Sequence, residues 1–406
     1  MKGRTVGDLF ETRRDLLKLG GLGLAGASVD AVWPLQMRAG EGSKVQPRGA
    51  ARNVIFYEVS GAISHIESFD FKESAGMPKD LDTRKVASGL YMPQLLFPKL
   101  SKHMDKFAIL RSMLSHEEVH FRAQYYQQTG RQLNLAFARE IPAIGSVVAM
   151  ELESRRRPND TFPAYMSLYL EKGAAGALST GFLPPRYSVV DINPDAAVKG
   201  NALDQKAVEL LEERWRLLLK LRDAERTRVS GFGKEMAGYQ DFYDTAHRLL
   251  SDDRWPDAFK ITEQDRKRYG NNPVAISAIL ARNVLAQDAG THFIHLCHPG
   301  WDHHVYIWDR KAPSNHYKLC EEFDPALSSL MEDLSTIRSK TDPSKTLLDE
   351  TLVVVMSEFG RTPGALNNMA GRDHYNKCYP ALFAGAGVKA GKILGRTDSD
   401  GARCLD

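Results

Sequence analysis

The sequence predicts an α/β fold with a largely parallel sheet. A continuous apolar run at 351–355 (TLVVV) is typical of a strand covered on both faces of such a sheet. A second apolar run at 291–297 is followed by an amphipathic helix pattern at 322–337, so 291–362 has the order strand, helix, strand of a βαβ unit. In open α/β sheets, ligands bind beyond the carboxyl ends of the strands. Because polar residues follow both strands directly, we expect the functional site there.

The N-terminus has the features of a twin-arginine export signal, which we predict at 1–31. Arg13 and Arg14 precede a Gly- and Ala-rich apolar stretch at 19–29, which is shorter than the roughly 20 residues that a membrane-spanning helix needs. Small residues at 25–27 suit a cleavage site. This signal predicts the twin-arginine machinery as a partner, no integral membrane span, and a periplasmic or extracellular location. The alternative is a disordered basic N-terminus.

The composition is that of an ordinary soluble globular protein. Of the 406 residues, 43% are hydrophobic and 26% are charged. After a polar linker at 32–52 we predict one domain at 53–406. The net charge of +3 gives no reason to expect nucleic acid or a membrane surface as a partner. Four cysteines lie far apart without a C-x-x-C pair, so they are either free thiols or partners in one or two bridges. They are Cys297, Cys320, Cys378 and Cys404.

The first predicted strand, at 53–59, ends in a loop of small, polar and acidic residues. Glu67 and Asp70 follow Ser64 in this loop, which makes it a candidate ligand loop. The alternative is a turn whose Ser and Asp side chains cap a helix.

A second predicted strand, at 106–113, leads into a predicted helix at 115–130. His116 and His120 are four residues apart, so both would lie on one helix face, as two metal ligands on a helix do. The pair is a weak signal alone, because ordinary surface histidines have the same spacing.

The middle of the chain is predicted to be largely helical. A strand is expected at 161–170. Leucine and charge patterns predict helices at 202–228, 238–250 and 274–288. We expect 201–270 to be a helical insertion on the sheet domain.

Candidate metal ligands follow the strand at 291–297. Asp302, His303 and His304 come directly after it. A carboxylate and two imidazoles at the end of a buried strand are costly to desolvate unless a cation compensates them. A metal explains them economically, and the alternative is a loop held by an Asp–His hydrogen bond.

Two further groups of polar residues follow the strand at 351–355. Glu358 and Arg361 come first, in SEFGRT. Asp373 and His374 lie beyond a Gly- and Asn-rich loop that could fold them back over the same edge of the sheet.

These motifs resemble one family. The order GWDHH, MSEFGRTP and GRDHY, followed by AGAGVKAGKILGRTDSDG, is similar to the DUF1501 family of exported bacterial proteins, within the alkaline-phosphatase/sulfatase-like superfamily. The resemblance covers 50–401. It implies a three-layer αβα sandwich with a mixed, mostly parallel, alkaline-phosphatase-like sheet. It also implies hydrolysis or transfer of phosphate or sulfate esters at a one- or two-metal site on the carboxyl edge.

The resemblance also assigns roles to individual residues. The metal ligands it implies are Asp302 with His303 or His304, Glu358, and His374 with Asp373 beside it. Glu67 stands where the superfamily has an aspartate after the first strand. Ser112, Ser115 and His116 compete for the position of the nucleophile.

The predicted function is hydrolysis of phosphate or sulfate esters, small or polymeric, with one or two divalent ions of zinc, manganese, calcium or magnesium. Arg361 would neutralise charge that develops on the ester, and His116 or His120 would complete the site or act as an acid. A formylglycine sulfatase mechanism is disfavoured, because the segment from Cys297 to Trp301 has tryptophan where the C/S-x-P-x-R motif needs arginine.

A second predicted function belongs to another class. A non-catalytic exported binding or scaffold protein would keep the fold without the nucleophile. Members of the family continue beyond the TDSDG segment, so we also expect this chain to be truncated at its C-terminus.

Overall fold

A computed structural model describes residues 49–169, 178–200, 205–226 and 244–406. Its centre is an eight-stranded sheet with the order β12-β4-β11-β8-β1-β7-β5-β6. Within it, only β11 runs antiparallel to its neighbours, so the predicted mixed, mostly parallel sheet is confirmed. The strands are β1 (Asn53–Val59), β4 (Phe107–Met113), β5 (Tyr165–Leu168), β6 (Val190–Ile192), β7 (Phe293–His298), β8 (Thr351–Met356), β11 (Tyr379–Gly385) and β12 (Lys392–Leu394).

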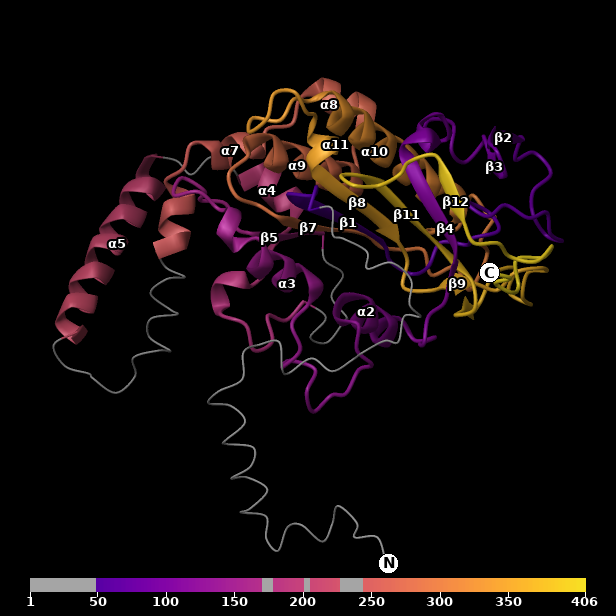
Figure 1. The fold of residues 1–406 in the computed structure, drawn as a ribbon, viewed down its shortest axis with the longest axis horizontal. Coiled ribbons are helices and arrows are strands. Elements are labelled where there is room, and N and C mark those ends of the chain that lie inside the picture. Colours follow the sequence, from indigo (N-terminus) through magenta and orange to yellow (C-terminus); the bar gives the residue numbers. More distant parts are fainter. Residues whose placement is uncertain (1–48, 170–177, 201–204, 227–243) are drawn as a thin grey trace, which may run out of the picture. The chain divides into compact units, whose positions relative to one another are not determined.

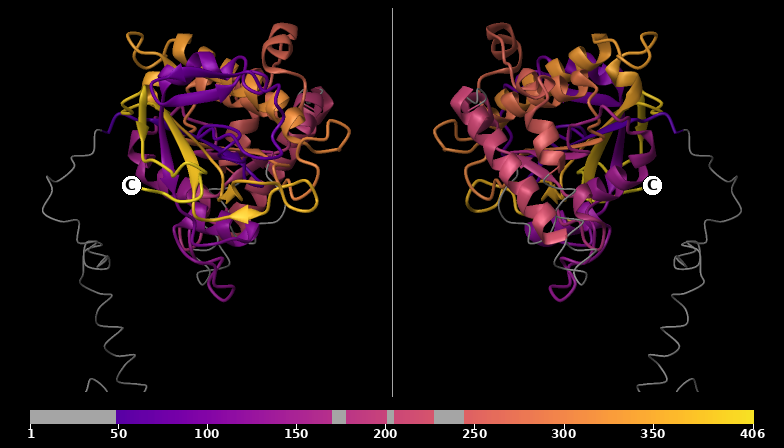
Figure 2. Two further views of the ribbon diagram at one scale, coloured as in Figure 1. Left: turned by 90° about the vertical axis from the view of Figure 1, so that its right-hand side faces the viewer. Right: turned by 90° about the vertical axis from the view of Figure 1, so that its left-hand side faces the viewer.

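Helices cover both faces of the sheet. Alternate side chains of β1 point to opposite faces, so Ile55 and Tyr57 belong to the larger buried core and Phe56 to a second one. The helices α9 (Pro273–Gln287) and α10 (His316–Thr336) pack on the face of the larger core and contribute many of its buried residues, whereas α3 (Ile144–Glu151) packs on the other face. Figures 1 and 2 show the sheet between these layers. The predicted three-layer αβα architecture is confirmed.

Strands β7 and β8 pair in parallel with opposite edges of β1. His298 at the end of β7 lies opposite Val59, and Met356 at the end of β8 lies opposite Glu58. The loops that follow these three strands therefore leave the sheet side by side at its carboxyl edge. This is the edge where the sequence predicts the site.

Two small ribbons lie outside the main sheet. Strands β2 (Thr83–Ala87) and β3 (Leu90–Pro93) form one, and β9 (Gly360–Arg361) and β10 (His374–Tyr375) form the other. In the second ribbon His374 pairs directly with Arg361. The loop between 361 and 374 thus folds back over the carboxyl edge.

Two helices begin several residues away from their predicted starts. The helix expected at 115–130 is α2 (His120–Thr129), so His116 precedes the helix and the two histidines do not share a helix face. The helix expected at 322–337 already begins at His316, because the Asn315 side chain accepts a hydrogen bond from the Lys318 amide and caps it.

Four of the remaining described helices lie in the segment predicted as an insertion, and five lie elsewhere. They are α4 (Pro194–Gly200), α5 (Gln205–Arg226), 244–250, α7 (Arg254–Ala258), α8 (Glu263–Tyr269), α11 (Leu347–Glu350), and the 3-10 helices η3 (Leu100–Lys106), η4 (Glu153–Arg155) and η5 (Pro185–Tyr187). Residues 238–243 of one predicted helix lie outside the described part. Because Phe259 and Tyr269 are buried in the larger core, the end of 201–270 is built into the helical layer.

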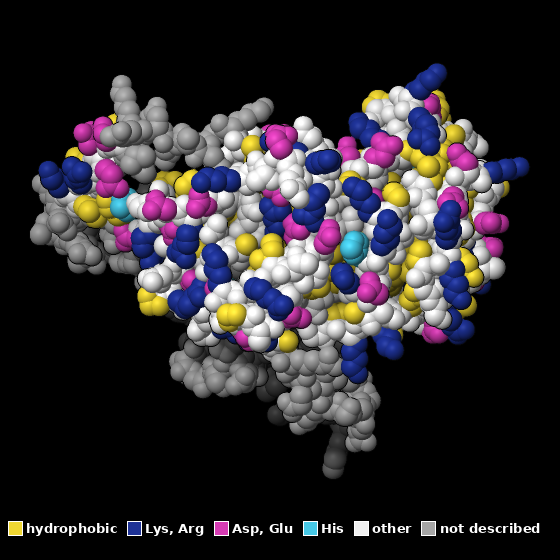
Figure 3. All heavy atoms as spheres, turned by 90° about the horizontal axis from the view of Figure 1, so that it is seen from above, with side chains coloured by type: hydrophobic (Ala, Val, Ile, Leu, Met, Phe, Trp, Pro, Cys, Tyr) yellow, Lys and Arg dark blue, Asp and Glu magenta, His cyan; other side chains and the backbone are white. Residues whose placement is uncertain are grey.

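The surface over α8 and α10 carries both signs of charge. Lys and Arg side chains alternate with Asp and Glu across this face (Figure 3). Such mixing is typical of a solvated helical surface. Among the described helices, none is long and apolar enough to cross a membrane.

Candidate metal centre

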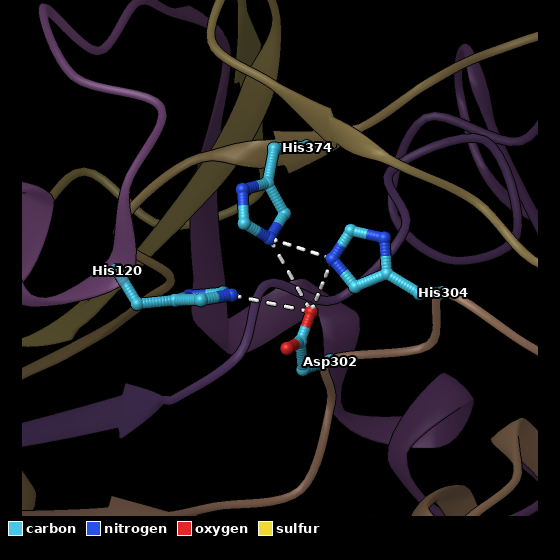
Figure 4. A group of neighbouring side chains, drawn as sticks. All are labelled: His120, Asp302, His304 and His374. Carbon is cyan, nitrogen blue, oxygen red and sulfur yellow. Dashed lines mark hydrogen bonds and ion pairs between the residues drawn. The ribbon is translucent and has the colours of Figure 1, made fainter.

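Four side chains converge at the carboxyl edge of the sheet: His120, Asp302, His304 and His374. One ligand atom of each lies within 4.8 Å of the others. Asp302 Oδ1 lies 3.2 Å from His120 Nε2. The same oxygen lies 3.0 Å from His304 Nε2 and 3.4 Å from His374 Nε2. Figure 4 shows the three imidazole rings directed at this carboxylate. We call these four residues the histidine–aspartate cluster.

The fold brings these residues from three separate segments. His120 is the first residue of α2. Asp302 and His304 lie in the loop that follows β7, and His374 begins β10. Each ligand is therefore attached to, or close to, a regular element.

The second ring nitrogen of each imidazole bonds to an oxygen. The partners are Glu358 Oε1 for His120 at 2.6 Å, Asp373 Oδ1 for His304 at 2.9 Å, and the Glu118 carbonyl oxygen for His374 at 2.5 Å. Carbonyl and ionised carboxylate oxygens only accept hydrogen bonds, so each Nδ1 carries a proton and donates it. In a neutral imidazole the Nε2 atom then presents a lone pair to the cluster.

This arrangement calls for a cation. His304 Nε2 and His374 Nε2 are 2.8 Å apart and face each other. Two lone pairs at that distance repel each other unless a proton or a metal ion lies between them. Histidines whose Nδ1–H groups are held by carboxylates or carbonyls are the usual ligands of protein-bound metals. The donor set therefore fits a metal ion.

The pKa values in the cluster point the same way. Burial lowers the pKa of His120, but its hydrogen bonds to Asp302 and Glu358 outweigh burial and raise the pKa to about 9. Burial would raise the pKa of Asp302, yet hydrogen bonds from His120, His374 and Arg361 hold it well below its usual range. Both shifts show that the site stabilises positive charge beside its carboxylates.

The dimensions and accessibility of the cluster also suit a metal. Ligand atoms about 2.0–2.2 Å from a tetrahedral ion lie about 3.3–3.6 Å apart, close to the separations from Asp302 Oδ1. The Asp302 and His304 side chains are 46% and 40% exposed, so the cluster is open to solvent on one side. A buried structural metal site has no such opening, and a substrate-binding site needs one.

Two glycines and a phenylalanine hold the loops in place. A Cβ on Gly61, whose φ is +99°, would lie 2.6 Å from the Asp302 amide nitrogen, and one on Gly371 would lie 2.1 Å from the His304 carbonyl carbon. Only glycine allows these backbones to approach so closely. The buried Phe359 ring packs on His120 and His374, with ring centroids 4.8 and 4.7 Å away. This packing restricts both imidazoles.

The buried Arg361 side chain connects the loops of the site. This side chain is 1% exposed. Its Nε donates to Ala62 O at 3.2 Å and its Nη1 to Arg372 O at 3.0 Å, while Nη2 donates to Gly61 O and pairs with Asp302 Oδ1. Because these groups occupy the guanidinium, this geometry favours positioning of Asp302 over direct contact with a substrate.

The other predicted site residues fall into two groups. Glu358 and Asp373 bond to His120 and His304, so they support ligands in this geometry. Glu67, Ser115 and His116 are not members of the cluster.

Each of these three has a different contact. Glu67 is fully buried, 2.6 Å from Arg372 Nη2. The Ser115 hydroxyl accepts from the Glu117 amide at 3.2 Å. The His116 ring packs against Tyr126, with centroids 5.2 Å apart. His303, the alternative to His304, is 3% exposed and lies against the Trp301 ring.

Several contributors could not be recognised from the sequence. The Glu118 carbonyl oxygen, Gly61, Gly371 and Phe359 act through contacts with distant segments. For Gly61, Phe359 and Gly371 the only local signal was the motif that contains each of them, SGAISH, SEFG and GRDHY.

Sequence comparison assigns the chain to a family. The DUF1501 model, described as a protein of unknown function, matches residues 51–406. The chain belongs to the DUF1501 family. The family predicted from the three motifs is thereby confirmed. No curated protein matches the chain.

Solved structures similar to this DUF1501 protein include members of the alkaline-phosphatase superfamily. A superfamily protein from Vibrio parahaemolyticus is 10% identical at a TM-score of 0.39, over 85% of this chain and 62% of its own length. The lipoteichoic acid synthase LtaP from Listeria monocytogenes has the same identity, TM-score and coverage of this chain, over 68% of its length. The PsFucS1 sulfatase from Pseudoalteromonas sp. is 13% identical at a TM-score of 0.36, over 87% of this chain and 66% of its own. Likeness at this level establishes neither substrate nor reaction.

Proposed function

We propose that this DUF1501 protein is an exported metal-dependent hydrolase of phosphate or sulfate esters. The observation that carries the proposal is the convergence of three imidazole Nε2 atoms on Asp302 Oδ1 at an exposed edge of the sheet. His120, Asp302, His304 and His374 would hold one divalent ion. A set rich in imidazole favours zinc over manganese, calcium and magnesium.

Some residues of the site would bind the ion, and others hold those ligands in position. A bound divalent ion supplies Lewis acidity toward an ester oxygen. Glu358, Asp373 and the Glu118 carbonyl oxygen hold the imidazole Nδ1 protons and so fix the ring orientations. Arg361 fixes the Asp302 carboxylate. The exposed side of Asp302 and His304 leaves room for the ester.

Ser112, Ser115 and His116 were predicted to compete for the position of the nucleophile, and none of them belongs to the histidine–aspartate cluster. The Ser115 hydroxyl and the His116 ring contact Glu117 and Tyr126, outside the histidine–aspartate cluster. Attack by water on the ester is therefore the favoured route, and it needs no covalent intermediate on the chain.

The test is turnover by protein loaded with zinc or manganese, on a panel of aryl and alkyl phosphate mono- and diesters and sulfate esters. We expect hydrolysis of at least one class, and its loss in Asp302→Ala. The variant His103→Ala removes a histidine outside the cluster and should keep the activity. Stoichiometric metal without turnover on any ester would contradict the hydrolase assignment.

A second candidate function is binding without turnover. The Arg361 guanidinium favours it, because its nitrogen atoms already contact backbone oxygens, Asp302 and His304. Metal-loaded protein that binds phosphate or sulfate esters in a calorimetric titration, yet leaves them intact, would establish this function.

Export is part of the proposal. The twin-arginine signal predicted at 1–31 lies outside the described residues and stays a prediction. Replacing Arg13 and Arg14 together with lysine should retain the protein in the cytoplasm, which cell fractionation would show. Unchanged export of this double variant would contradict the signal.

A further inference from the structure

The two cysteines nearest the C-terminus lie side by side. Cys378 immediately precedes β11, and its Sγ lies 3.3 Å from Cys404 Sγ. Cys378 is buried and Cys404 is partly exposed, and both are thiols in this structure. A disulfide bond joins sulfur atoms about 2.05 Å apart, so the remaining gap is within reach of side-chain rotation.

Independent contacts hold this pair together. Thr397 and Cys404 form an antiparallel bridge, so the chain between them doubles back. His65 Nε2–H donates to the Gly401 carbonyl oxygen at 2.7 Å. The Tyr375 hydroxyl donates to the Ala402 carbonyl oxygen. The segment 397–404 is thereby attached to the first loop and to the neighbour of His374.

The other two cysteines have different surroundings. Cys297 lies in β7 and Cys320 in α10, and their side chains are 2% and 0% exposed. Both thiols are therefore buried out of reach of an oxidant in solution. They serve as internal controls for any oxidation experiment.

We propose that Cys378 and Cys404 form a disulfide bond that fastens the C-terminal segment to the start of β11. This inference does not depend on the proposed metal. The oxidant is a disulfide, either glutathione disulfide or a protein disulfide. The compartment predicted from Arg13 and Arg14 is one where such bonds persist.

The reaction is two successive exchanges. The more exposed Cys404 loses its proton, and its thiolate attacks one sulfur of the oxidant and displaces the other as a thiolate. The Cys378 thiolate then attacks Cys404 Sγ and displaces the second half of the oxidant. Two thiols of the chain give up two protons and two electrons, and the oxidant disulfide becomes two thiols.

Peptide mapping tests the bond directly. The full chain is incubated with excess glutathione disulfide, unfolded in guanidinium with an alkylating reagent, and digested without reduction. We expect the peptides with Cys378 and Cys404 to be joined, and those with Cys297 and Cys320 to be alkylated. Alkylation of both Cys378 and Cys404, or pairing of Cys404 with Cys297 or Cys320, would overturn the proposal.

Thermal unfolding gives a second readout. The bond closes a loop whose ends are 26 residues apart in the sequence. Closure of such a loop in a domain of this size should raise the Tm of the oxidised protein by about 3–6 °C over the reduced one. Cys404→Ser should lose this oxidant-dependent shift, whereas Ser399→Ala, in the same segment, should keep it. An equal shift in Cys404→Ser would contradict the proposed pair.

Discussion

Two groups of charged side chains at the carboxyl edge of the sheet use a carboxylate in opposite ways. In the histidine–aspartate cluster, Asp302 faces three imidazoles and its side chain is 46% exposed. In the second group, Glu67 contacts Arg372, and both side chains are 0% exposed. We call this second group the Glu67–Arg372 pair. The sequence alone placed Asp302 and Glu67 in the same class of metal ligand.

The partner of each carboxylate decides its role. The Arg372 guanidinium is a permanent cation that also donates to Thr362 O and Gly364 O, so the protein itself compensates the charge of Glu67. Asp302 also pairs with a permanent cation, the buried Arg361 guanidinium, but on its exposed side it faces three imidazoles whose Nε2 atoms could hold an added cation. We therefore expect the Glu67–Arg372 pair to contribute mainly to stability and the histidine–aspartate cluster to metal binding.

The largest expected effect comes from breaking the Glu67–Arg372 pair. Arg372→Met leaves a buried carboxylate without its cation, which should lower the free energy of unfolding by about 3–5 kcal/mol in a denaturant titration. Arg396→Met is the control, because Arg396 pairs with Asp406 at the surface and its loss should cost about 1 kcal/mol or less. Equal losses in the two variants would show that the buried pair is no more important than a surface one.

The histidine–aspartate cluster should respond in the opposite way. His304→Ala should weaken zinc binding more than 100-fold, because a direct ligand matters more than the supporting residues whose loss costs 10–100-fold. The free energy of unfolding of the metal-free protein should change by only about 1 kcal/mol, since the side chain is 40% exposed. Competition titration with a chelating dye and denaturant unfolding measure the two quantities. A large loss of stability without a change in zinc affinity would show that His304 stabilises the fold and is not a metal ligand.

Asp324 adds a third case to this comparison of carboxylates, because it is buried and forms no ion pair among the described residues. It accepts hydrogen bonds from the backbone amides of Lys99 and Leu100. Burial raises its pKa to about 6 in spite of these bonds. The folded protein thus binds the proton of Asp324 more tightly than the unfolded chain does. The protonated Asp324 therefore makes its full contribution to stability below about pH 4, and this contribution is lost as the pH rises through 6.

The corresponding variant is Asp324→Asn, which cannot titrate. Between pH 4 and pH 7 the free energy of unfolding of the native protein should fall relative to the variant by about 2–3 kcal/mol. Denaturant unfolding of both proteins across this range measures the difference. A difference that stays constant with pH would show that Asp324 does not carry the raised pKa.

The smallest expected effect concerns the support of His304. Asp373→Asn keeps an oxygen acceptor for His304 Nδ1 but removes its charge, and this carboxylate is largely exposed. Zinc affinity should fall about tenfold, the lower end for a supporting residue. Asp400→Asn, at an exposed position that is not part of the histidine–aspartate cluster, should leave the affinity unchanged. A loss in Asp373→Asn as large as in His304→Ala would make Asp373 itself a ligand.

The sheet could be predicted from the sequence because its central strands are short, continuous apolar runs. The runs at 53–59, 291–297 and 351–355 needed no knowledge of the rest of the chain. Helix starts were less certain, since Asn315 acts as a cap that the apolar pattern of α10 does not reveal. The polar loops directly follow these strands in the sequence, which was enough to predict that they lie at the carboxyl edge of the sheet.

The site was only partly predictable, because partners far apart in sequence define each role. Asp302, His304 and His374 were expected as ligands, and the structure brings them together. His120 was expected as a catalytic residue, and its partner Glu358 lies 238 residues away in the sequence. Arg361 was expected to face a substrate, but contacts with the first loop surround it. Spacing along the chain carries no information on such contacts.

X-ray absorption at the zinc edge tests the central claim most directly. The account predicts that zinc-loaded protein shows about three imidazole nitrogens with oxygen at about 2.0–2.1 Å. The imidazole scattering should decrease in His374→Ala and remain in His103→Ala. Zinc held without imidazole in the native protein, or no bound zinc or manganese after reconstitution, would contradict the histidine–aspartate cluster as a metal centre.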